Sequence, residues 1–435
     1  MRAADALVVG AGIAGLAAAE RLAAAGRRVV VVEARDRTGG RIHTVERPGP
    51  DPPVELGAEF VHGHSAELLE LIRAADLTLE DVPERHQPGP GLAGWAHPDP
   101  RALLARLLRR PGEALLDRPV AELLRELPGE LGRSGELEAV AGYLQGFHAA
   151  DLALLGTRAL AENEAAEDAE GDEPHRLREG YGALVRWLVD RLDPGLVEFR
   201  LRTVVRAVRW REGEARLEVR APDGATSDIV APRAILTLPL PMLRRPPDDP
   251  GAVPIDPAPA GWPAALAALH MGAAERIVLR FDERWWVSGP EAGPGFVHGT
   301  SEPFPVWWTS LPSLAPVLTG WTGGPRAAAL AGQGKEAVLQ AALESLASVF
   351  ARDAVELRSL VCSADWHDWT ADPFSGGAYS YGGVGAIEAR AALARPVAGT
   401  LFLAGEAVAE RGRNGTVHGA LASGREAAAR LLGQE

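Results

Sequence analysis

The sequence predicts an α/β protein with two domains. Its 435 residues exceed the roughly 100 to 200 residues of a typical domain, and 46% of them are apolar, enough for sizeable cores. The chain opens with alternating strand and helix signals and closes with an apolar strand at 400–404 followed by a helix, which would return it to the first domain. We therefore expect one domain with a parallel sheet plus a β-meander, and a second α+β domain with a mixed sheet and helices.

The first elements are a strand, a turn, a helix and a second strand. Residues 6–9 are apolar, residues 10–15 hold three glycines, and an Ala/Leu-rich helix then runs to Ala25. Gly26 is a typical helix C-cap, and 29–32 is the next strand. This order is a βαβ unit, and its two strands are expected to be parallel.

The middle of the chain predicts a helical insertion, a meander and a second sheet. Residues 100–192 have mainly helical patterns, whereas 197–238 contain β signals around a turn at Asp223 and Gly224. Seven prolines over 244–263 interrupt any regular element and mark a crossover between domains. Beyond it we expect four strands, at 276–281, 295–298, 305–309 and 317–321. We also expect a long helix at 326–350 and a final helix that begins near Thr416.

The charge balance and the single cysteine exclude several classes of protein. With 45 basic and 59 acidic side chains the net charge is −14, and no basic run is present, so we expect no nucleic-acid partner. The negative charge favours a cationic ligand or serves solubility alone. Cys362 is the only cysteine, which excludes an intrachain disulfide and a cysteine metal site and favours a cytoplasmic protein. We expect neither a signal peptide nor a membrane span.

Residues 10–15 carry a dinucleotide-binding pattern. Gly10 makes the tight turn, Gly12 lets the backbone approach a pyrophosphate, and Gly15 allows close helix packing. The N–H groups and the dipole at the helix start attract phosphate, and Glu33 at the end of the next strand can accept both ribose hydroxyls. The pattern, which includes Ala14, predicts a Rossmann-like domain that binds either NAD or FAD.

Three segments decide between these two cofactors. Residues 33–41, 55–63 and 401–406 read EARDRTGGR, ELGAEFVHG and LFLAGE, and in this order they resemble the flavin amine oxidase family, which includes monoamine oxidases, polyamine oxidases and lysine-specific histone demethylases. The resemblance spans residue 5 to about 432 and is weakest over 85–190. It implies FAD as the cofactor. With the elements above, it implies an FAD-binding domain formed by 1–70, 196–245 and 363–435, beside a substrate-binding domain formed by 71–195 and 246–362.

The resemblance also implies a role for each matching residue. Gly39, Gly40 and Arg41 would wrap the pyrophosphate and the ribityl chain, and Gly57 and Ala58 would pass under the flavin ring. The other expected cofactor contacts are Ala34, Arg35, Glu59, Val205 at the adenine, Gly405, Glu406 at the ribityl or ribose hydroxyls, Thr416 and Val417. The backbone N–H of Val417, at a helix start, would stabilise the negative charge that grows on the ring during reduction.

Four residues are candidates for the substrate side of the ring: Tyr379, Thr416, His62 and Arg276. Tyr379 resembles one wall of the family's aromatic cage, or it fills the core; Ala378 stands where monoamine oxidases have the cysteine that bonds FAD, so we expect non-covalent binding. Thr416 replaces the second cage tyrosine, which leaves the cage open on one side. His62 either orients an amine and takes its proton, or it supports the wall.

Arg276 occupies the position at which the family has a lysine that holds a water against the flavin. The only lysine of the chain is Lys335, inside the expected helix 326–350. Because arginine does not change its protonation at working pH, the electron acceptor stays open between oxygen and another oxidant. The alternative is that Arg276 is a strand-edge charge that faces solvent.

Two further groups of side chains are candidates for the pocket wall. The tryptophans either form an apolar or cation-binding surface or pack in the core: Trp307, Trp308, Trp366 and Trp369. The acidic run over 162–173 either attracts a polyamine at an entrance or is a solvated helix face.

Together these residues predict an FAD-dependent oxidoreductase that acts on a small-molecule substrate, an amine, at its CH–NH bond. Hydride would pass to flavin N5 from the carbon next to a neutral nitrogen, the imine would hydrolyse, and oxygen or another acceptor would reoxidise the flavin. Two alternatives stay open. One is an FAD-dependent CH–CH oxidoreductase, like the desaturases and porphyrinogen oxidases, which an apolar pocket without Tyr379 would favour; the other is a flavin-holding binding protein without turnover, which Arg276 suggests.

Overall fold

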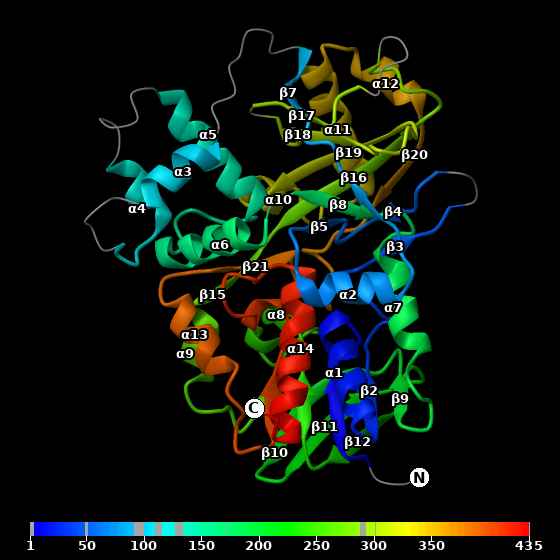
Figure 1. The fold of residues 1–435 in the computed structure, drawn as a ribbon, viewed down its shortest axis with the longest axis vertical. Helices are drawn as coiled ribbons and strands as arrows, with labels where there is room; N and C mark the ends of the chain where they lie inside the picture. Colours follow the sequence, from blue (N-terminus) through cyan, green and yellow to red (C-terminus); the bar gives the residue numbers. More distant parts are fainter. Residues whose placement is uncertain are drawn as a thin grey trace.

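The computed structural model describes residues 4–47, 51–90, 100–108, 115–126, 134–171, 173–287, 293–300 and 302–434. Figure 1 shows two lobes, with the blue N-terminal helix and the red C-terminal helix side by side in the lower lobe. Both chain ends lie in the lower lobe, and the yellow strands and helices form much of the upper one. The chain therefore returns to its first lobe, as its two ends predict.

The lower lobe is built on a parallel five-stranded sheet. Its strands, in chain order, are β1 (Ala6–Val9), β2 (Val29–Val32), β9 (Val197–Arg200), β13 (Ala234–Leu236) and β22 (Leu401–Leu403). They are ordered β22-β13-β1-β2-β9, so that Val8 pairs with Ile235 on one side and Val31 on the other. Both faces of the central strands are covered, which explains why their sequences are uninterrupted apolar runs.

Two helices cover one face of this sheet: α1 (Ile13–Ala24) and α14 (Val417–Leu432). Their close approach depends on a glycine, because a Cβ at Gly424 would lie 2.1 Å from the carbonyl oxygen of Ala14. Ala18, Leu22 and Ala428 are fully buried in this layer. Helix α1 begins at the carboxyl edge of the sheet, the edge at which ligands bind in folds of this type.

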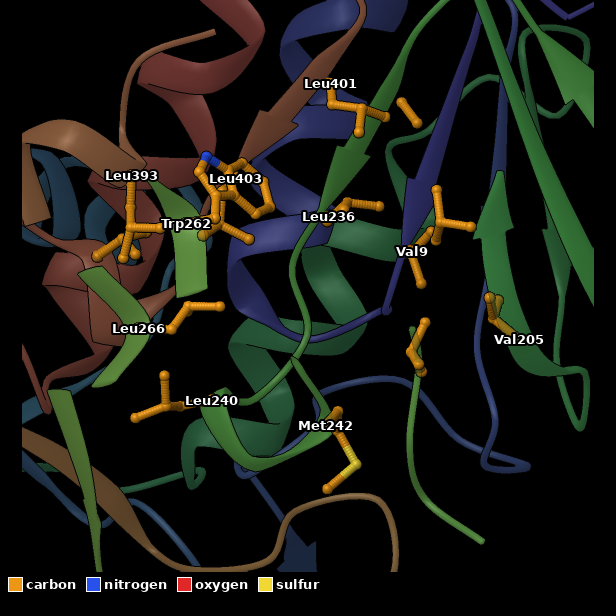
Figure 2. Packing of buried hydrophobic residues seen from close by; sticks show 14 of the residues in the cluster. Val9, Val205, Leu236, Leu240, Met242, Trp262, Leu266, Leu393, Leu401 and Leu403 are labelled. Carbon is orange, nitrogen blue, oxygen red and sulfur yellow. The ribbon is translucent and has the colours of Figure 1, made fainter. Parts of the chain in front are cut away.

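A β-meander covers the other face, as the sequence predicts. Its antiparallel strands are β10 (Val204–Arg211), β11 (Glu214–Arg220) and β12 (Thr226–Ala231), and β14 (Ile255–Asp256) adds a short parallel strand beside β10. Val208 and Leu217 point into the shared core and are fully buried. Figure 2 shows Val9, Leu236 and Val205 within this core.

The upper lobe contains a six-stranded sheet in the order β20-β16-β19-β18-β17-β7. Its strands are β7 (His86–Pro88), β16 (Ala274–Phe281), β17 (Phe296–His298), β18 (Val306–Thr309), β19 (Val317–Gly323) and β20 (Val361–Trp366). Helix α11 (Lys335–Phe350) packs on one face, where Leu346 meets Ile277 and Leu279 in one core. The short helix α12 (Ala354–Leu360) follows it.

The prediction of one helix over 326–350 is wrong. Helix α10 (Pro325–Leu330) ends before α11 begins at Lys335. Gly332 and Gly334 lie between them with φ of +75° and +86°, outside the right-handed helical region. The two glycines therefore separate the segment into two helices.

The helical region over 100–190 also contains a strand. Its helices are α3 (Pro100–Leu108), α4 (Val120–Arg125), α5 (Ser134–Phe147), α6 (Thr157–Glu170) and α7 (Tyr181–Asp190). Strand β8 (Pro174–Leu177) interrupts them and pairs with β5 (Phe60–His62) and β6 (Leu79–Asp81). This pairing carries the chain from the helices back to the segment that contains His62.

The remaining elements are short: β3 (Thr44–Val45), β4 (Val54–Glu55), α2 (Ala66–Ala74), α8 (Leu240–Arg244), α9 (Trp262–Ala267), β15 (Leu269–Gly272), β21 (Tyr379–Gly382), α13 (Ala386–Leu393) and the 3-10 helix η2 (Glu406–Val408). Within the described ranges, no helix combines the length and apolar character that crossing a bilayer requires.

Candidate functional site

A cavity of about 1450 Å³ brings distant segments of the chain together between the lobes. All predicted cofactor-binding and catalytic residues except Gly15 line it: Gly10, Gly12, Ala14, Glu33, Ala34, Arg35, Gly39, Gly40, Arg41, Gly57, Ala58, Glu59, His62, Val205, Arg276, Tyr379, Gly405, Glu406, Thr416 and Val417. Gly15 lies behind the turn, where a Cβ would be 2.0 Å from the carbonyl oxygen of Gly10. Its place is thus one of close packing rather than of cavity wall.

One end of the cavity is the start of α1. Gly12 is the N-cap of this helix and offers no side chain, so the helix N–H groups face the cavity uncapped. A Cβ at Gly12 would meet nothing nearer than 3.8 Å, which means that the surface there is bare backbone. Glu33 is buried beside the turn and accepts hydrogen bonds from the N–H groups of Ala11 (2.8 Å) and Arg35 (2.9 Å). The positive helix end and this carboxylate suit a phosphate and a ribose respectively.

The glycine pair at 39 and 40 closes over the same turn. Gly39 and Gly40 have φ of +99° and +60°, and a Cβ at Gly40 would lie 3.2 Å from the Cα of Gly12. The Arg35 side chain pairs with Asp372 at 2.7 Å and donates to the Ser375 hydroxyl at 3.0 Å. Residues near 33–41 and 372–375 thereby form one wall, although they are far apart in the sequence.

Glu406 joins three segments at the centre of the cavity. Its Oε1 accepts from Arg41 at 2.7 Å, and its Oε2 accepts from the Ser380 hydroxyl (2.6 Å), the Ser380 N–H (3.1 Å) and the Gly415 N–H (3.0 Å). Burial opposes ionisation, but the charge of Arg41 and the bonds from Ser380 hold the pKa of Glu406 below its usual range. The side chain is an ionised acceptor whose partners are all donors.

The other end of the cavity is the start of α14. The Thr416 hydroxyl accepts from the Gly419 N–H at 2.9 Å and donates to the Arg413 carbonyl at 2.7 Å, so it caps the helix. This cap leaves the N–H groups of Val417 and His418 without an intrahelical acceptor. Because Thr416 and Val417 line the cavity, a second positive helix end faces it.

The loop at 57–59 is fixed by two arginines. A Cβ at Gly57 would lie 1.8 Å from the Arg41 carbonyl oxygen, so only glycine fits there. The Glu59 carboxylate accepts from Arg176 Nε at 2.7 Å, from Trp308 Nε1 at 3.1 Å and from Arg276 Nη2. Burial opposes its ionisation, but Arg276 and Arg176 hold the pKa of Glu59 below its usual range.

Arg276 faces the cavity and not the solvent. Only 6% of its surface is exposed, and its Nη1 donates to the Gly57 carbonyl at 2.9 Å. Its guanidinium lies 5.5 Å from the Trp308 ring centroid, a cation–π arrangement. The interpretation of Arg276 as a solvent-facing strand-edge charge is therefore wrong.

An aromatic wall runs along the upper side of the cavity. The Tyr379 ring stacks on Trp321 with centroids 6.5 Å apart and planes at 10°, and Trp321 lies 6.0 Å from Trp308. The Tyr379 hydroxyl donates to the Phe147 carbonyl at 2.6 Å, and all these residues line the cavity. The stack and the hydroxyl bond fix the Tyr379 ring against the wall.

The four tryptophans that the sequence singles out divide into two groups. Trp308 and Trp369 line the cavity, and Trp369 Nε1 donates to the Leu56 carbonyl at 2.7 Å. Trp307 is fully buried in the upper core, and Trp366 packs against that core and donates to Glu275. The prediction of a pocket wall thus fits Trp308 and Trp369, and the alternative of core packing fits Trp307 and Trp366.

His62 lies between aromatic rings in the cavity wall. Its ring is 5.8 Å from Phe60 and 6.1 Å from Phe147. Burial, followed by the charges of His418 and Arg101, lowers the pKa of His62 to about 4. The imidazole is therefore neutral at neutral pH and able to accept a proton or a hydrogen bond.

Part of the acidic run on α6 also reaches the cavity. Glu167 and Glu170 line it, and Glu167 lies 3.4 Å from Arg101. Arg101 Nε donates to the Tyr143 hydroxyl at 2.9 Å. Asp172, within the same run, lies outside the described residues. The face of α6 that carries Glu167 and Glu170 is thus a cavity wall and not only a solvated surface.

Three wall residues were not predicted from the sequence, namely Phe147, Tyr143 and Trp321, and neither was Arg176, the partner of Glu59. Trp321 ends the strand expected at 317–321, so its place beside Tyr379 depends on how that strand pairs. Arg176 reaches Glu59 because it lies on β8, opposite Phe60 in the register, and the helical pattern around β8 concealed this strand. Glu170 was visible only as one member of a charged run.

Comparison with known proteins agrees with this architecture. A family model described as flavin containing amine oxidoreductase matches residues 13–139 and 128–432. Polyamine oxidase 3 of Oryza sativa subsp. japonica is 29% identical over 456 residues, which cover 98% of this chain and 88% of that protein. Polyamine oxidase 1 of the same subspecies is 30% identical over 510 residues, which cover 98% and 96%. The structure of cyclohexylamine oxidase from Brevibacterium oxydans IH-35A shares the fold, with a TM-score of 0.79, 20% identity and 99% of each chain covered.

The residues of the cavity fit FAD. The bare backbone of Gly12 and the buried Glu33 carboxylate suit the pyrophosphate and the ribose, and the start of α14 suits the electron-accepting ring. Ala378 lines the same cavity and has no side-chain group able to bond a flavin, so FAD is held non-covalently. The family match spans most of the sequence, and the chain belongs to the family of flavin-containing amine oxidoreductases.

Proposed function

We propose that this chain is an FAD-dependent enzyme that oxidises the CH–NH bond of a small amine. The reacting nitrogen is neutral, and the substrate carries a second amino group that is positively charged. The observation that carries the proposal is the single cavity in which the starts of α1 and α14, one aromatic wall and one acidic wall face the same space. We place the dinucleotide along α1 and the flavin ring at α14, in front of Tyr379. The proposed FAD domain comprises 1–70, 196–245 and 363–435, and the proposed substrate domain comprises 71–195 and 246–362.

FAD supplies the redox chemistry that no side chain has: when bound, it takes a hydride from the carbon next to the amine nitrogen, and the resulting imine hydrolyses in water. The chain's own residues hold the reactants. The N–H of Val417 and the dipole of α14 favour the negative charge that develops at the helix start. Tyr379 and Trp321 form a flat wall against which the substrate carbon is oriented.

The charges near the 57–59 loop favour a neutral reacting nitrogen. Arg176 and Arg276 bring two positive charges to one carboxylate, Glu59, so this cluster of three side chains has a net charge of +1. An ammonium next to this cluster would be repelled, whereas a neutral amine would not. His62, uncharged at neutral pH, lies on the same wall and accepts a hydrogen bond from the N–H of the neutral amine.

The wall on α6 favours a substrate with a second, charged amine. Glu167 and Glu170 bring carboxylates to the cavity on the helix that faces the lower lobe. The aromatic wall lies between this acidic surface and the 57–59 loop, and its faces accept methylene groups and cations. A diamine or polyamine fits this sequence of surfaces, and the two rice relatives carry the name polyamine oxidase.

The acceptor that reoxidises the flavin is proposed to be oxygen or another small oxidant. Arg276 brings a permanent positive charge to the cavity wall, where a negatively charged oxygen species would be stabilised. A cytoplasmic location is proposed because Cys362 is the only cysteine, and no nucleic-acid partner is proposed for a chain with a charge of −14.

Anaerobic titration of the FAD-bound protein with two matched amines tests the proposal. Putrescine and butylamine have the same carbon chain, but butylamine lacks the second amine. We expect both to bleach the flavin absorption band, with putrescine effective at a concentration at least tenfold lower, and we expect Glu167→Gln to remove most of that difference. A flavin band that no amine bleaches would reduce the chain to a flavin-holding binding protein. Equal potency of the two amines would contradict the second-charge part of the proposal.

A further inference from the structure

Glu170 links the helix that carries the acidic wall to the start of α14. It is the last residue of α6, and its side chain is 18% exposed at the cavity wall. Its Oε1 pairs with Arg413 Nη2, and its Oε2 lies 3.6 Å from His418 Nε2. Both partners belong to the segment in which α14 begins, so one carboxylate contacts both sides of the helix cap.

The contact with Arg413 continues into the cap itself. The Arg413 carbonyl accepts the Thr416 hydroxyl at 2.7 Å, and that hydroxyl accepts the Gly419 N–H at 2.9 Å. Arg413 is thus held by Glu170 through its side chain and holds Thr416 through its backbone. A change at Glu170 therefore acts on α14 through Arg413 and not by direct contact with the cofactor.

The backbone of Glu170 fixes a second part of the cavity wall. Its carbonyl accepts the His64 N–H at 2.7 Å, and a Cβ at Gly63 would lie 2.8 Å from that carbonyl oxygen. The loop after β5, which begins directly beyond His62, is held against the end of α6 in this way. A substitution that keeps this backbone in place changes the charge at α14 without removing the loop contact.

The side chains around the carboxylate form a balanced charge pair. Burial is the main reason that the pKa of His418 is lowered, with Glu170 opposing and Arg413 adding to the effect, so this imidazole is neutral at neutral pH. The negative charge of Glu170 is then matched by the positive charge of Arg413 alone. Loss of either partner leaves one uncompensated charge beside the positive end of α14.

We propose that Glu170 is a positioning residue for the flavin ring, which it serves by holding the first turn of α14 and by balancing the charge that the ring meets there. The inference rests on the proposed placement of the ring at α14. Glu170→Gln leaves the Arg413 charge uncompensated, which favours the reduced, more negative ring. We expect the ratio of binding constants for reduced and oxidised FAD to rise about two- to fivefold.

Substitution of the arginine partner tests the direction of the expected change in this ratio. Arg413→Gln leaves the Glu170 charge uncompensated and is expected to lower the same ratio by a similar factor. The double variant, Glu170→Gln with Arg413→Gln, has no net charge change and is expected to return to within about twofold of the wild-type ratio. Glu170→Asp, which keeps the charge, is expected to stay close to wild type.

The measurement is a redox titration of the FAD-bound protein without amine. The flavin midpoint potential reports the ratio of the binding constants for reduced and oxidised FAD. Glu167→Gln is the matched control: it lies on the same helix and the same cavity wall, but its ionic partner is Arg101, outside the α14 segment. We expect no shift from it. Shifts of opposite sign from the two single variants support the proposal, and shifts of the same sign, or none from Glu170→Gln, overturn it. FAD-bound protein that oxidises no amine would contradict the proposed function and still yield this result.

Discussion

Arg41 and Glu406 are 365 residues apart in the sequence and form a partly buried ion pair of 2.7 Å. Arg41 follows the glycine pair that closes over the start of α1, and Glu406 opens the segment that leads to α14. The pair therefore holds together the two parts of the chain that we assign to the two ends of FAD. Arg41 also donates to the Ala378 carbonyl at 2.8 Å, which connects the pair to the strand of Tyr379.

Glu406→Gln is expected to lower the free energy of unfolding by about 2 kcal/mol, because it removes the charge partner of the partly buried Arg41 and weakens the charge-assisted hydrogen bonds of Glu406. Denaturant unfolding with and without added FAD measures the loss. Glu356→Gln is the control, since the Arg352–Glu356 pair of 2.9 Å has both side chains well exposed. It should cost less than about 1 kcal/mol. Equal losses from the two variants would contradict the structural role of Glu406.

Gly12→Ala and Gly15→Ala are expected to separate cofactor binding from folding. A Cβ at Gly12 meets nothing within 3.8 Å, so the fold should persist, whereas FAD affinity should fall at least about tenfold because the methyl group occupies the phosphate surface. A Cβ at Gly15 would lie 2.0 Å from a backbone oxygen, so this variant should lose stability in the absence of FAD. Thermal unfolding of flavin-free protein and FAD titration distinguish the two. Wild-type FAD affinity in folded Gly12→Ala protein would place the phosphate elsewhere.

The pH profile of activity should follow the substrate amine and not His62. Burial lowers the pKa of His62 to about 4, so the imidazole stays neutral throughout the range in which amines lose their protons. We expect kcat/KM to rise about tenfold per pH unit up to the pKa of the reacting amine. His62→Gln should lower the values and keep the shape of the profile. An inflection near pH 6.5 in the wild type that His62→Gln removes would show that His62 titrates in catalysis.

Glu275 is expected to make the fold less stable at high pH. This side chain is fully buried behind Arg276, and burial raises its pKa from 4.5 to about 8, although Trp366 donates to it at 2.6 Å. The folded chain therefore binds the proton more tightly than the unfolded chain does. The stability that the protonated group contributes is complete below about pH 4.5 and is lost as the pH rises through about 8.

Glu275→Gln should remove this dependence and leave the protein more stable than wild type by roughly 3 to 5 kcal/mol above pH 8. Chemical unfolding at a series of pH values gives the comparison. Parallel stability curves for the two proteins would mean that Glu275 is ionised in the folded chain at neutral pH.

The sequence predicted the part of the fold that local patterns determine. The strand at 6–9, the glycine turn and the helix that follows could be read because each glycine has a local geometric task, and the meander could be read from its turn at Asp223 and Gly224. The segment 326–350 was predicted as one continuous helix, because Gly332 and Gly334 are two isolated glycines within an otherwise helical pattern. In the structure they separate two helices.

The contacts among the substrate-side residues could not be predicted because they depend on pairings between distant segments, although Tyr379, Thr416, His62 and Arg276 were each predicted and line the cavity. Arg176 reaches Glu59 only through the register of β8 with β5, and Trp321 reaches Tyr379 only through the pairing of β19 with β16 and β18. Glu170 contacts Arg413 across 243 residues. Such contacts have no local signal, since they depend on how distant strands and loops meet in the fold.

Titration of flavin-free protein with FAD measures whether the two ends of the chain form one FAD site. We expect one FAD per chain and weaker binding in both Gly12→Ala, at the start of α1, and Glu406→Gln, before α14. Folded protein that binds no FAD, or that binds it with an affinity unchanged by either substitution, would show that the two ends do not form such a site.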